Sequence, residues 1–429
     1  MSFATRLFIG VDVGTSGVRV MAIGIDGSVR AQSRTPLPPP LTDAAGRQEQ
    51  NPRLWWQALS TAVSQLSKSL PDDSEPVALA LDGTSGSLLL ADADGHPLHA
   101  ALLYADQRAT VQAQQIAGIA PPESAAHGAS SALAKLLWMR DHGIRKAAYA
   151  LHQADWLLGR LGAPWGTSDE NNALKLGYDP VRRIWPEWLE QLGVSTAWLP
   201  HAHEPGTPVG RLSVSAAAAI GLPAGLTLVA GTTDSVAAFL ATGADEPGDG
   251  VSSLGSTLAL KVLSSRPVFE PALGIYSHRL GERWLAGGAS NSGGAVLRAW
   301  FSDEDIARYS RQLEPERPTG LDYYPLLQPG ERFPIADPTL APRLEPRPAE
   351  PRVFFQAMLE GIATIEARGY SCLRDAGADR LRTVRSVGGG AANALWTDIR
   401  GRRLGVPMLS SAQTEAAYGS ALLARAACA

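Results

Sequence analysis

A pattern of strand, glycine-rich polar turn and strand occurs twice in this chain of 429 residues and limits the folds that it can adopt. The first copy, FIGVDVGTSGVRVMAIGIDG, starts at Phe8 and has a Gly-Thr-Ser-Gly turn between two runs rich in β-branched residues. The second copy, GVSSLGSTLALKVLSS, covers residues 250–265 and has a Gly-Ser-Thr turn. One copy in each half of the chain predicts two similar lobes that face each other across a ligand cleft.

The rest of the chain favours an α/β fold. Strand-like runs alternate with segments of helical periodicity, such as NPRLWWQALSTAVSQLSKSL from Asn51, and this alternation is typical of α/β proteins. Gly, Pro and acidic residues cluster at 242–250. We therefore expect an N-terminal lobe over residues 1–243 and a C-terminal lobe over residues 244–429. The stretch from Pro315 to Pro351, rich in Pro, Arg and Glu, predicts an irregular surface segment.

Composition excludes several classes of protein. Lys and Arg number 38 against 42 Asp and Glu, a formal net charge of −4, so the chain lacks the basic excess of a nucleic-acid or membrane binder. We expect a small-molecule partner instead. Cys372 and Cys428 are the two cysteines, and their number and spacing argue against a disulfide framework or a zinc ribbon. We therefore expect the protein to work in a reducing cytoplasm. The chain reaches Asp12 before a signal-peptide core can develop, so we expect no export.

Both glycine-rich turns have the chemistry of a phosphate site. Glycine lets backbone N–H groups approach an anion closely, and hydroxyl groups add donors. Asp12, at the end of the strand before the first turn, could hold Mg²⁺ directly or through water. A polar hairpin tip without a ligand would have the same sequence, but the recurrence of the turn favours phosphate binding. The candidate residues are Thr15 and Ser16 in the first turn and Gly255, Ser256 and Thr257 in the second.

A third glycine-rich segment, VGGGAANALWTDIRGRRLG, predicts a strand that runs into a helix. Gly389 and Gly390 at the helix N-terminus suit a nucleotide, and the amide of Asn393 could address its purine or ribose, with Trp396 nearby. A tight strand-to-helix turn without a ligand is the alternative. The spacing of a Rossmann fingerprint is absent, and no lysine lies in a Walker A motif.

Asp234 lies where a buried strand, TLVAGTT, changes into an apolar helix. Aspartate is a favoured helix cap, so its place there requires no catalysis. The same position also suits a base, because the helix dipole keeps the carboxylate ionised. Phosphoryl transfer needs an oriented proton acceptor more than a strong one. Asp234 is therefore the candidate acceptor for the proton of an attacking hydroxyl.

Two polar clusters in the first lobe could bind a polyol. They are Asp82 to Ser85 and Tyr104 to Arg108. Each sugar hydroxyl must find a partner once it leaves water, and compact hydroxyl and carboxylate groups provide one. Polar surface turns remain the alternative.

Taken in order, these segments resemble the FGGY family of carbohydrate kinases, in the superfamily of actin, Hsp70 and hexokinase. The resemblance covers nearly the whole chain, through GVDVGTSGVRV, EQNPRLWW, LDGTSGS, YADQRA, GTTDS, SLGST, YYPLLQPGERFP, GGGAAN and EAAYGSALLA. It implies two RNase H-like lobes, with sugar deep in the cleft and ATP mainly on the second lobe. It also implies ATP and Mg²⁺ as cofactors, sugar and ATP as the partners, with neither nucleic acid nor membrane, and a monomer or homodimer.

The resemblance also implies roles for single residues. Asp234 is similar to the catalytic base and Asp12 to the magnesium-associated carboxylate, and both would line the substrate site. Ser85 and Asp106 fall at positions similar to sugar contacts. The remaining matches are phosphate-binding and adenosine-binding positions: Thr15, Ser16, Gly255, Ser256, Thr257, Gly389, Gly390, Asn393 and Trp396.

Departures from the family pattern bear on the substrate. Xylulose kinases usually have a Gln-Met-His-type stretch where this chain has Thr84-Ser85-Gly86, and a Trp where it has Tyr104. In these features the chain resembles the small cyanobacterial and plant branch of xylulose-kinase-like proteins. The resemblance implies phosphorylation of a terminal hydroxyl of a ketopentose, with D-ribulose expected first and D-xylulose second. A sugar or nucleotide sensor without catalysis and an ATPase acting on protein partners are the alternatives.

Overall fold

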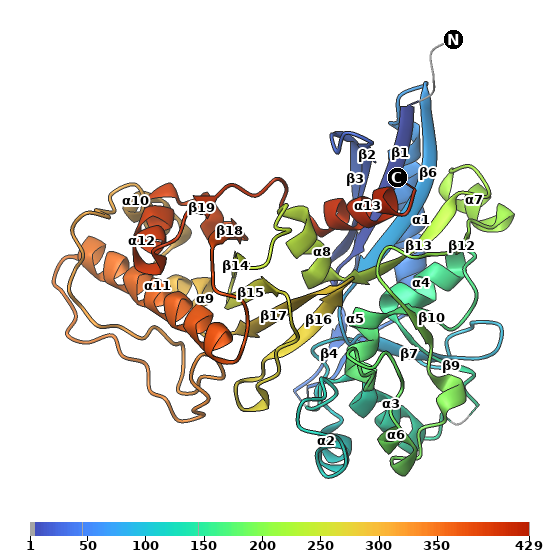
Figure 1. The fold of residues 1–429 in the computed structure, drawn as a ribbon, viewed down its shortest axis with the longest axis horizontal. Coiled ribbons are helices and arrows are strands. Elements are labelled where there is room, and N and C mark those ends of the chain that lie inside the picture. The colour runs from blue at the N-terminus through green and yellow to red at the C-terminus, as the bar shows by residue number, and fades with distance from the viewer. Residues whose placement is uncertain (1–4, 45, 145, 429) are drawn as a thin grey trace. The chain divides into compact units, whose positions relative to one another are not determined.

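The computed structural model describes residues 5–44, 46–144 and 146–428. It is an α/β structure that divides into two compact units (Figure 1). Unit 1 contains the described residues up to Ala241, the segment His278–Gly281 and the described residues from Glu415 onwards. Unit 2 contains Thr242–Ser277 and Glu282–Thr414. No helix among the described residues is both long enough and apolar enough to cross a bilayer.

A six-stranded sheet forms the centre of unit 1. Its strands, in spatial order, are β12 (Pro208–Arg211), β13 (Thr227–Thr233), β6 (Ser74–Gly83), β1 (Thr5–Val13), β2 (Gly17–Gly24) and β3 (Val29–Pro36). Strand β1 pairs antiparallel with β2 and parallel with β6, which itself pairs parallel with β13. The three parallel strands β1, β6 and β13 therefore end at the same edge of the sheet.

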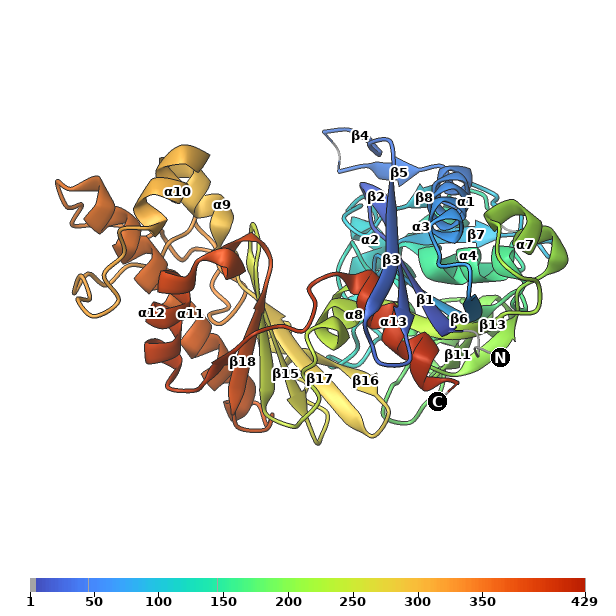
Figure 2. The same cartoon turned by 90° about the horizontal axis from the view of Figure 1, so that it is seen from above.

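Alternate side chains of β1 pack on opposite faces of this sheet. Leu7 and Ile9 belong to the apolar cluster that α1 (Pro52–Lys68), α4 (Gln153–Leu161) and α7 (Val214–Ile220) complete on one face. Phe8 packs on the other face with residues of α13 (Ala416–Ala426). The helix α8 (Asp234–Ala241) lies beside α13, as Figure 2 shows. Burial of both faces explains why β1 is apolar at consecutive positions.

The C-terminal helix α13 packs directly on the N-terminal strands of unit 1 (Figure 1). A methyl group at Gly10 would overlap the carbonyl oxygen of Ala417, so only glycine lets the helix approach β1 this closely. By its contacts, the segment from Glu415 onwards groups with unit 1.

Smaller elements complete unit 1. A five-stranded sheet has the order β4 (Leu41–Thr42), β5 (Gln48–Gln50), β8 (Ala101–Leu102), β7 (Leu88–Ala91) and β9 (Tyr149–His152). Helices α2 (Thr110–Ala117) and α3 (Ala132–Asp141) pack against each other, and α3 also packs on β7. The other elements are β10 (Thr167–Asp169), β11 (His201–His203), α5 (Glu170–Ala173), η1 (Leu174–Leu176), α6 (Trp188–Gln191) and η2 (Thr196–Trp198).

Unit 2 repeats the central arrangement of unit 1. Its sheet contains, in order, β17 (Arg283–Ala289), β15 (Leu258–Ser264), β14 (Asp249–Leu254), β18 (Thr383–Val387) and β19 (Met408–Leu409). The strand β16 (Tyr276–Leu280) comes next to β17 in the strand order, and its residues from His278 onwards are counted with unit 1. Strand β14 pairs antiparallel with β15 and parallel with β18, as β1 does with β2 and β6. The other elements are η3 (Pro271–Leu273), α9 (Gly294–Trp300), α10 (Asp303–Ser310), α11 (Pro351–Asp375), η4 (Gly389–Ala392) and α12 (Ala394–Leu404). The internal repeat predicted from the two turns is therefore present in the structure.

The proline-rich stretch before α11 is irregular, as predicted, but it is not only a surface segment. Residues 311–350 contain no helix or strand. Their side chains Tyr323 and Phe333 are nevertheless 2% and 1% exposed and belong to the core of unit 2. Aromatic residues spaced between prolines anchor the segment, and periodicity could not reveal this because the segment has no regular repeat.

Candidate active site

Three aspartates lie at the edge of the unit 1 sheet where its parallel strands end. Asp12 on β1 is the register partner of Asp82 on β6, and Asp82 is in turn the register partner of Thr232 on β13. Asp234 follows two residues later as the first residue of α8. Asp12 and Asp82 are 4% and 0% exposed, and Asp234 is half-buried. Carboxyl ends of parallel strands are where α/β proteins bind ligands, so this edge is the candidate site.

Asp12 is held by a cation from the neighbouring strand. Its Oδ2 accepts a hydrogen bond from Nη1 of Arg19 at 2.8 Å, and the two residues face each other across β1 and β2. Nε of Arg19 also lies 3.4 Å from a carboxylate oxygen of Glu415. Sequence reasoning missed Arg19. It could have been found by pairing residues outwards from the hairpin turn, because Val13 pairs with Val18 and Asp12 therefore pairs with Arg19.

Asp82 is a buried acid beside Asp12. Burial, and then the negative charge of Asp12, raise its pKa well above the usual range of an aspartate. The hydroxyl of Ser420 on α13 donates to its Oδ2 at 2.6 Å, which acts in the opposite direction. Asp234 adds a further negative charge that raises the pKa of Asp82. The expected polar turn at Asp82 is therefore a buried part of the carboxylate group rather than a surface turn.

Asp234 occupies the strand-to-helix position that its sequence predicted. Its Oδ1 accepts a hydrogen bond from the backbone N–H of Ser235 at 2.6 Å. Because Asp234 is the first helical residue, its carboxylate lies at the positive end of the dipole of α8.

The first phosphate turn is an exposed hairpin tip close to Asp12. The N–H of Gly14 donates to the carbonyl of Gly17 at 3.0 Å, which closes the turn and leaves Ser16 exposed and Thr15 half-exposed. Beside it lies a pocket of about 420 Å³, whose lining is Ser16, Gly17, Val18, Arg19, Arg34, Thr35 and Pro36. Arg34 adds positive charge to this pocket, which an anion favours, while the charge of Arg19 is shared with Asp12 and Glu415.

The second phosphate turn connects β14 and β15 within unit 2. The carbonyls of Gly255 and Ser256 accept hydrogen bonds from the N–H groups of Gly294 and Ala295, which start α9. A methyl group at Gly293 would lie 2.7 Å from Cα of Thr257, so the turn and the helix are in tight contact. Ser256 and Thr257 are exposed, as Ser16 is at the equivalent tip in unit 1.

The predicted adenosine residues combine open and packed positions. A methyl group at Gly389 would meet nothing within 4 Å, whereas one at Gly390 would lie 2.6 Å from the Trp396 ring. Trp396 is 4% exposed and donates from Nε1 to the carbonyl of Leu359. Asn393 caps α12 through Oδ1 and donates from Nδ2 to Ser310. Asn393 therefore has a structural role as the cap of α12, while a side chain at Gly389 would meet open space.

The two predicted sugar residues lie in turns that are linked to each other. Asp106 is fully buried and pairs with Arg108 through both oxygens, and its Oδ2 also accepts from the N–H of Gln48 at 2.7 Å. The hydroxyl oxygen of Ser85 is buried and has no hydrogen-bond partner among the described residues. Asp106 thus fixes the shape of its turn, and Ser85 offers an unsatisfied hydroxyl. Neither is the free surface residue of the alternative interpretation.

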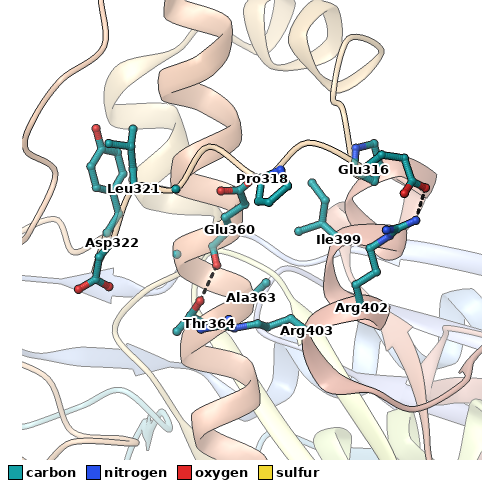
Figure 3. Close-up of a pocket in the computed structure, with 14 residues that line it drawn as sticks. Glu316, Pro318, Leu321, Asp322, Glu360, Ala363, Thr364, Ile399, Arg402 and Arg403 are labelled. Atoms are coloured by element: carbon teal, nitrogen blue, oxygen red, sulfur yellow. Dashed lines mark hydrogen bonds and ion pairs between the residues drawn. The ribbon is translucent and has the colours of Figure 1, made fainter.

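Two further polar features lie apart from these residues. A pocket of about 570 Å³ in unit 2 lies between α11, α12 and the segment before Leu321 (Figure 3). Its polar lining includes Glu360, Arg402 and Arg403, and it contains none of the predicted adenosine residues. Among the described residues, a group suited in spacing to a metal ion is Asp92, Asp94 and His96, in an exposed turn. That group contains none of the predicted site residues.

Comparison with known families covers almost the whole chain. The model for the N-terminal domain of the FGGY family of carbohydrate kinases matches residues 7–241, and the model for its C-terminal domain matches residues 250–428. The chain belongs to the FGGY family of carbohydrate kinases. The family resemblance of its motifs and its assignment as an ATP-dependent sugar kinase are thereby confirmed.

Relatives with nearly the same sequence identity to this FGGY kinase are named after different substrates. The xylulose kinase of Bacillus subtilis is 27% identical over an alignment of 420 positions that covers 92% of this chain and 83% of that protein. An autoinducer-2 kinase of Yersinia enterocolitica is 26% identical over a gapped alignment of 459 positions that covers 97% of this chain and 85% of that protein. Overall identity therefore does not choose between these substrates.

Solved structures confirm the fold of the FGGY kinase. The structure of a xylulose kinase from Rhodospirillum rubrum has a TM-score of 0.86 at 22% sequence identity, and the match covers 98% of this chain and 89% of that one. At this identity the likeness concerns the fold, which is the predicted α/β architecture of two units.

Proposed function

We propose that this FGGY kinase transfers the γ-phosphoryl group of ATP to a terminal hydroxyl of a ketopentose. The observation that carries the proposal is the group of Asp12, Asp82 and Asp234 at one edge of the unit 1 sheet. A carboxylate at a helix N-terminus, beside a turn with hydroxyl groups and arginines, has the parts that phosphoryl transfer requires. Ser85 and Asp106, in linked turns of the same unit, supply the sugar contacts.

Asp234 is the proposed base. The hydroxyl oxygen of the sugar forms a bond with the γ-phosphorus, the bond between that phosphorus and the β,γ-bridging oxygen breaks, and ADP leaves. The hydroxyl proton passes to the carboxylate of Asp234. Because the transition state is loose, orientation of the hydroxyl contributes more than basicity.

Asp12 is the proposed magnesium-associated carboxylate, and its donor set fits this role. Mg²⁺ keeps several waters and usually takes one or two protein carboxylates together with substrate phosphates, so a cage of protein ligands is not required. Arg19 fixes Asp12 through Oδ2 and thereby orients the carboxylate. The ion would neutralise charge on the phosphates of ATP. With its carboxylate oriented in this way, Asp12 would help to hold the ion near the phosphates of ATP.

The nucleotide would bind to the three glycine-rich segments. Thr15 and Ser16, and the Gly255–Thr257 turn, would donate to the phosphates. Gly389 would let backbone N–H groups approach the adenosine, with Asn393 at the N-terminus of α12. Gly390 and Trp396 would support this segment through their mutual packing. Under this proposal, residues 1–243 carry the sugar site and residues 244–429 most of the nucleotide site.

D-Ribulose is the first expected substrate and D-xylulose the second. The departures at Thr84-Ser85-Gly86 and Tyr104 from the pattern of xylulose kinases favour ribulose. The names of the most similar curated relatives favour xylulose. The two pentuloses differ in the orientation of one hydroxyl, and a few side chains around the site suffice to discriminate between them.

The test is release of ADP from Mg-ATP in the presence of D-ribulose, D-xylulose, L-ribulose or glycerol, or without sugar. We expect a large sugar-dependent rate with one pentulose, and that sugar is the substrate. A higher kcat/KM for D-xylulose would replace the first choice by the second. ATP turnover that ignores sugar would indicate the ATPase alternative. Binding of a pentulose without any turnover would indicate a sensor.

A further inference from the structure

Lys135 is a buried cation that the proposed chemistry does not use. It lies in α3 within the apolar run ALAKLLWM and is fully buried. Its Nζ donates to the carbonyl oxygens of Gly86 at 2.7 Å, Ser130 at 2.8 Å and Tyr104 at 3.3 Å. No carboxylate of the described residues lies within ion-pair distance of it. Burial of a charge without a counter-ion is costly, so a purely apolar helix face does not explain this lysine.

The acceptors of Lys135 connect the two turns that carry the proposed sugar contacts. Gly86 follows Ser85 directly, and Tyr104 precedes Asp106 by two residues. The same turns are joined a second time, because the N–H of Tyr104 donates to Oγ of Ser87 at 2.9 Å. The turns flank the paired strands β7 and β8, in which Leu88 is the register partner of Leu102. Beyond this strand pair, Lys135 and the hydroxyl of Ser87 join the turns themselves.

We propose that Lys135 is a positioning residue for the sugar site, whose ammonium group holds the turns of Ser85 and Asp106 together through their backbone carbonyls. This inference rests on the proposed function for its effect on catalysis. Lys135 would not touch the sugar. Loss of its charge would let the two turns separate, so that the hydroxyl groups of the sugar would no longer meet both contacts at once.

The charges around Lys135 make its ammonium sensitive to pH. Lys175 in η1 approaches the same turn, with Nζ 3.5 Å from the carbonyl of Ser85. Burial first, then the positive charge of Lys175, lower the pKa of Lys135 to about 7, while Asp106 raises it and Arg108 lowers it. As pH rises through about 7, Lys135 loses its proton and with it part of its hold on the carbonyls. Sugar affinity should therefore fall as pH rises.

The first test compares Lys135→Met with Lys68→Met, which changes an exposed lysine at the end of α1. Hydrogen exchange without ligands should be faster in the turns 84–87 and 103–106 of Lys135→Met only. The sugar KM of that variant should rise about tenfold, the effect of losing one hydrogen bond to a charged group, while the ATP KM stays within about twofold. Unchanged exchange in both turns, or equal rises in both KM values, would overturn the proposal.

The second test does not depend on whether Lys135→Met folds. In the wild type, the sugar KM should increase as pH rises through about 7. Lys175→Met removes the repulsion that lowers the pKa of Lys135, so the same increase should occur at higher pH. If the sugar KM of Lys175→Met depended on pH in the same way as that of the wild type, the role of the Lys135 charge would be contradicted. Suppose that Lys135→Met shows faster exchange in both turns but the wild-type protein phosphorylates no sugar. This result would contradict the proposed function and leave the positioning role of Lys135 intact.

Discussion

Asp12 and Asp82 are direct neighbours on the parallel strands β1 and β6, and they differ in what stabilises them. Asp12 accepts a hydrogen bond from the guanidinium of Arg19, whereas Asp82 accepts one from the neutral hydroxyl of Ser420. Two carboxylates this close resist ionising together. Burial and the negative charge of Asp12 therefore raise the pKa of Asp82 well above its usual range.

Asp234→Asn should abolish most turnover. The substitution keeps the size of the side chain and removes its ability to accept the hydroxyl proton, so kcat should fall by roughly 10²–10⁴-fold. ATP affinity, measured by equilibrium titration, should change by less than about twofold because the base contacts the acceptor. Asp72→Asn, an exposed change in the same unit, is the control. If the kcat of Asp234→Asn were close to that of the wild type, Asp234 would not be the base.

Asp12→Asn should weaken turnover through the metal. Loss of the carboxylate charge should lower kcat and raise the Mg²⁺ concentration that gives half-maximal rate at fixed ATP. Binding of Mn²⁺ in the presence of ADP, followed by electron paramagnetic resonance, reports the same change without turnover. If Asp12→Asn and the wild type bound Mn²⁺ with equal affinity, the magnesium role would be wrong.

Asp82→Asn should change how stability depends on pH. The pKa of Asp82 is raised in the folded state, so the folded protein keeps a proton that the unfolded chain releases as pH rises above about 4. This contribution to stability is present at low pH and is lost as pH rises towards the folded-state pKa. Asparagine does not titrate. The stability of the variant relative to the wild type should therefore be greater at pH 8 than at pH 5, as measured by thermal unfolding. The same difference in stability between variant and wild type at both pH values would contradict the raised pKa.

Gly389→Ala and Gly390→Ala form a matched pair. A methyl group at Gly389 meets open space, so stability should change by less than about 0.5 kcal/mol, while the ATP KM should rise if backbone there contacts the nucleotide. A methyl group at Gly390 would collide with Trp396 and should destabilise the protein by about 1–3 kcal/mol. Denaturant unfolding and steady-state kinetics distinguish these effects. An unchanged ATP KM in Gly389→Ala would remove that residue from the proposed nucleotide site.

The sequence was sufficient for features that local patterns encode. The two hairpin turns, the strand before Asp234 and the glycine-rich start of α12 follow from residue types at short spacing, and each lies where the pattern predicted. Contacts over long separations were not predictable in this way. The bonds of Lys135 to carbonyls 31 and 49 residues away depend on how α3 packs. The placement of α13 in unit 1 depends on a surface that forms only after folding.

That placement of α13 has a consequence for biosynthesis. The helix covers one face of a sheet whose strand β1 is made long before it, and it provides Ser420 to Asp82. That face therefore has no cover, and its apolar strands stay exposed, until the residues of α13 have left the ribosome. Early termination near residue 410 would therefore leave an aggregation-prone product, even though every predicted sugar-binding side chain would already have been synthesised.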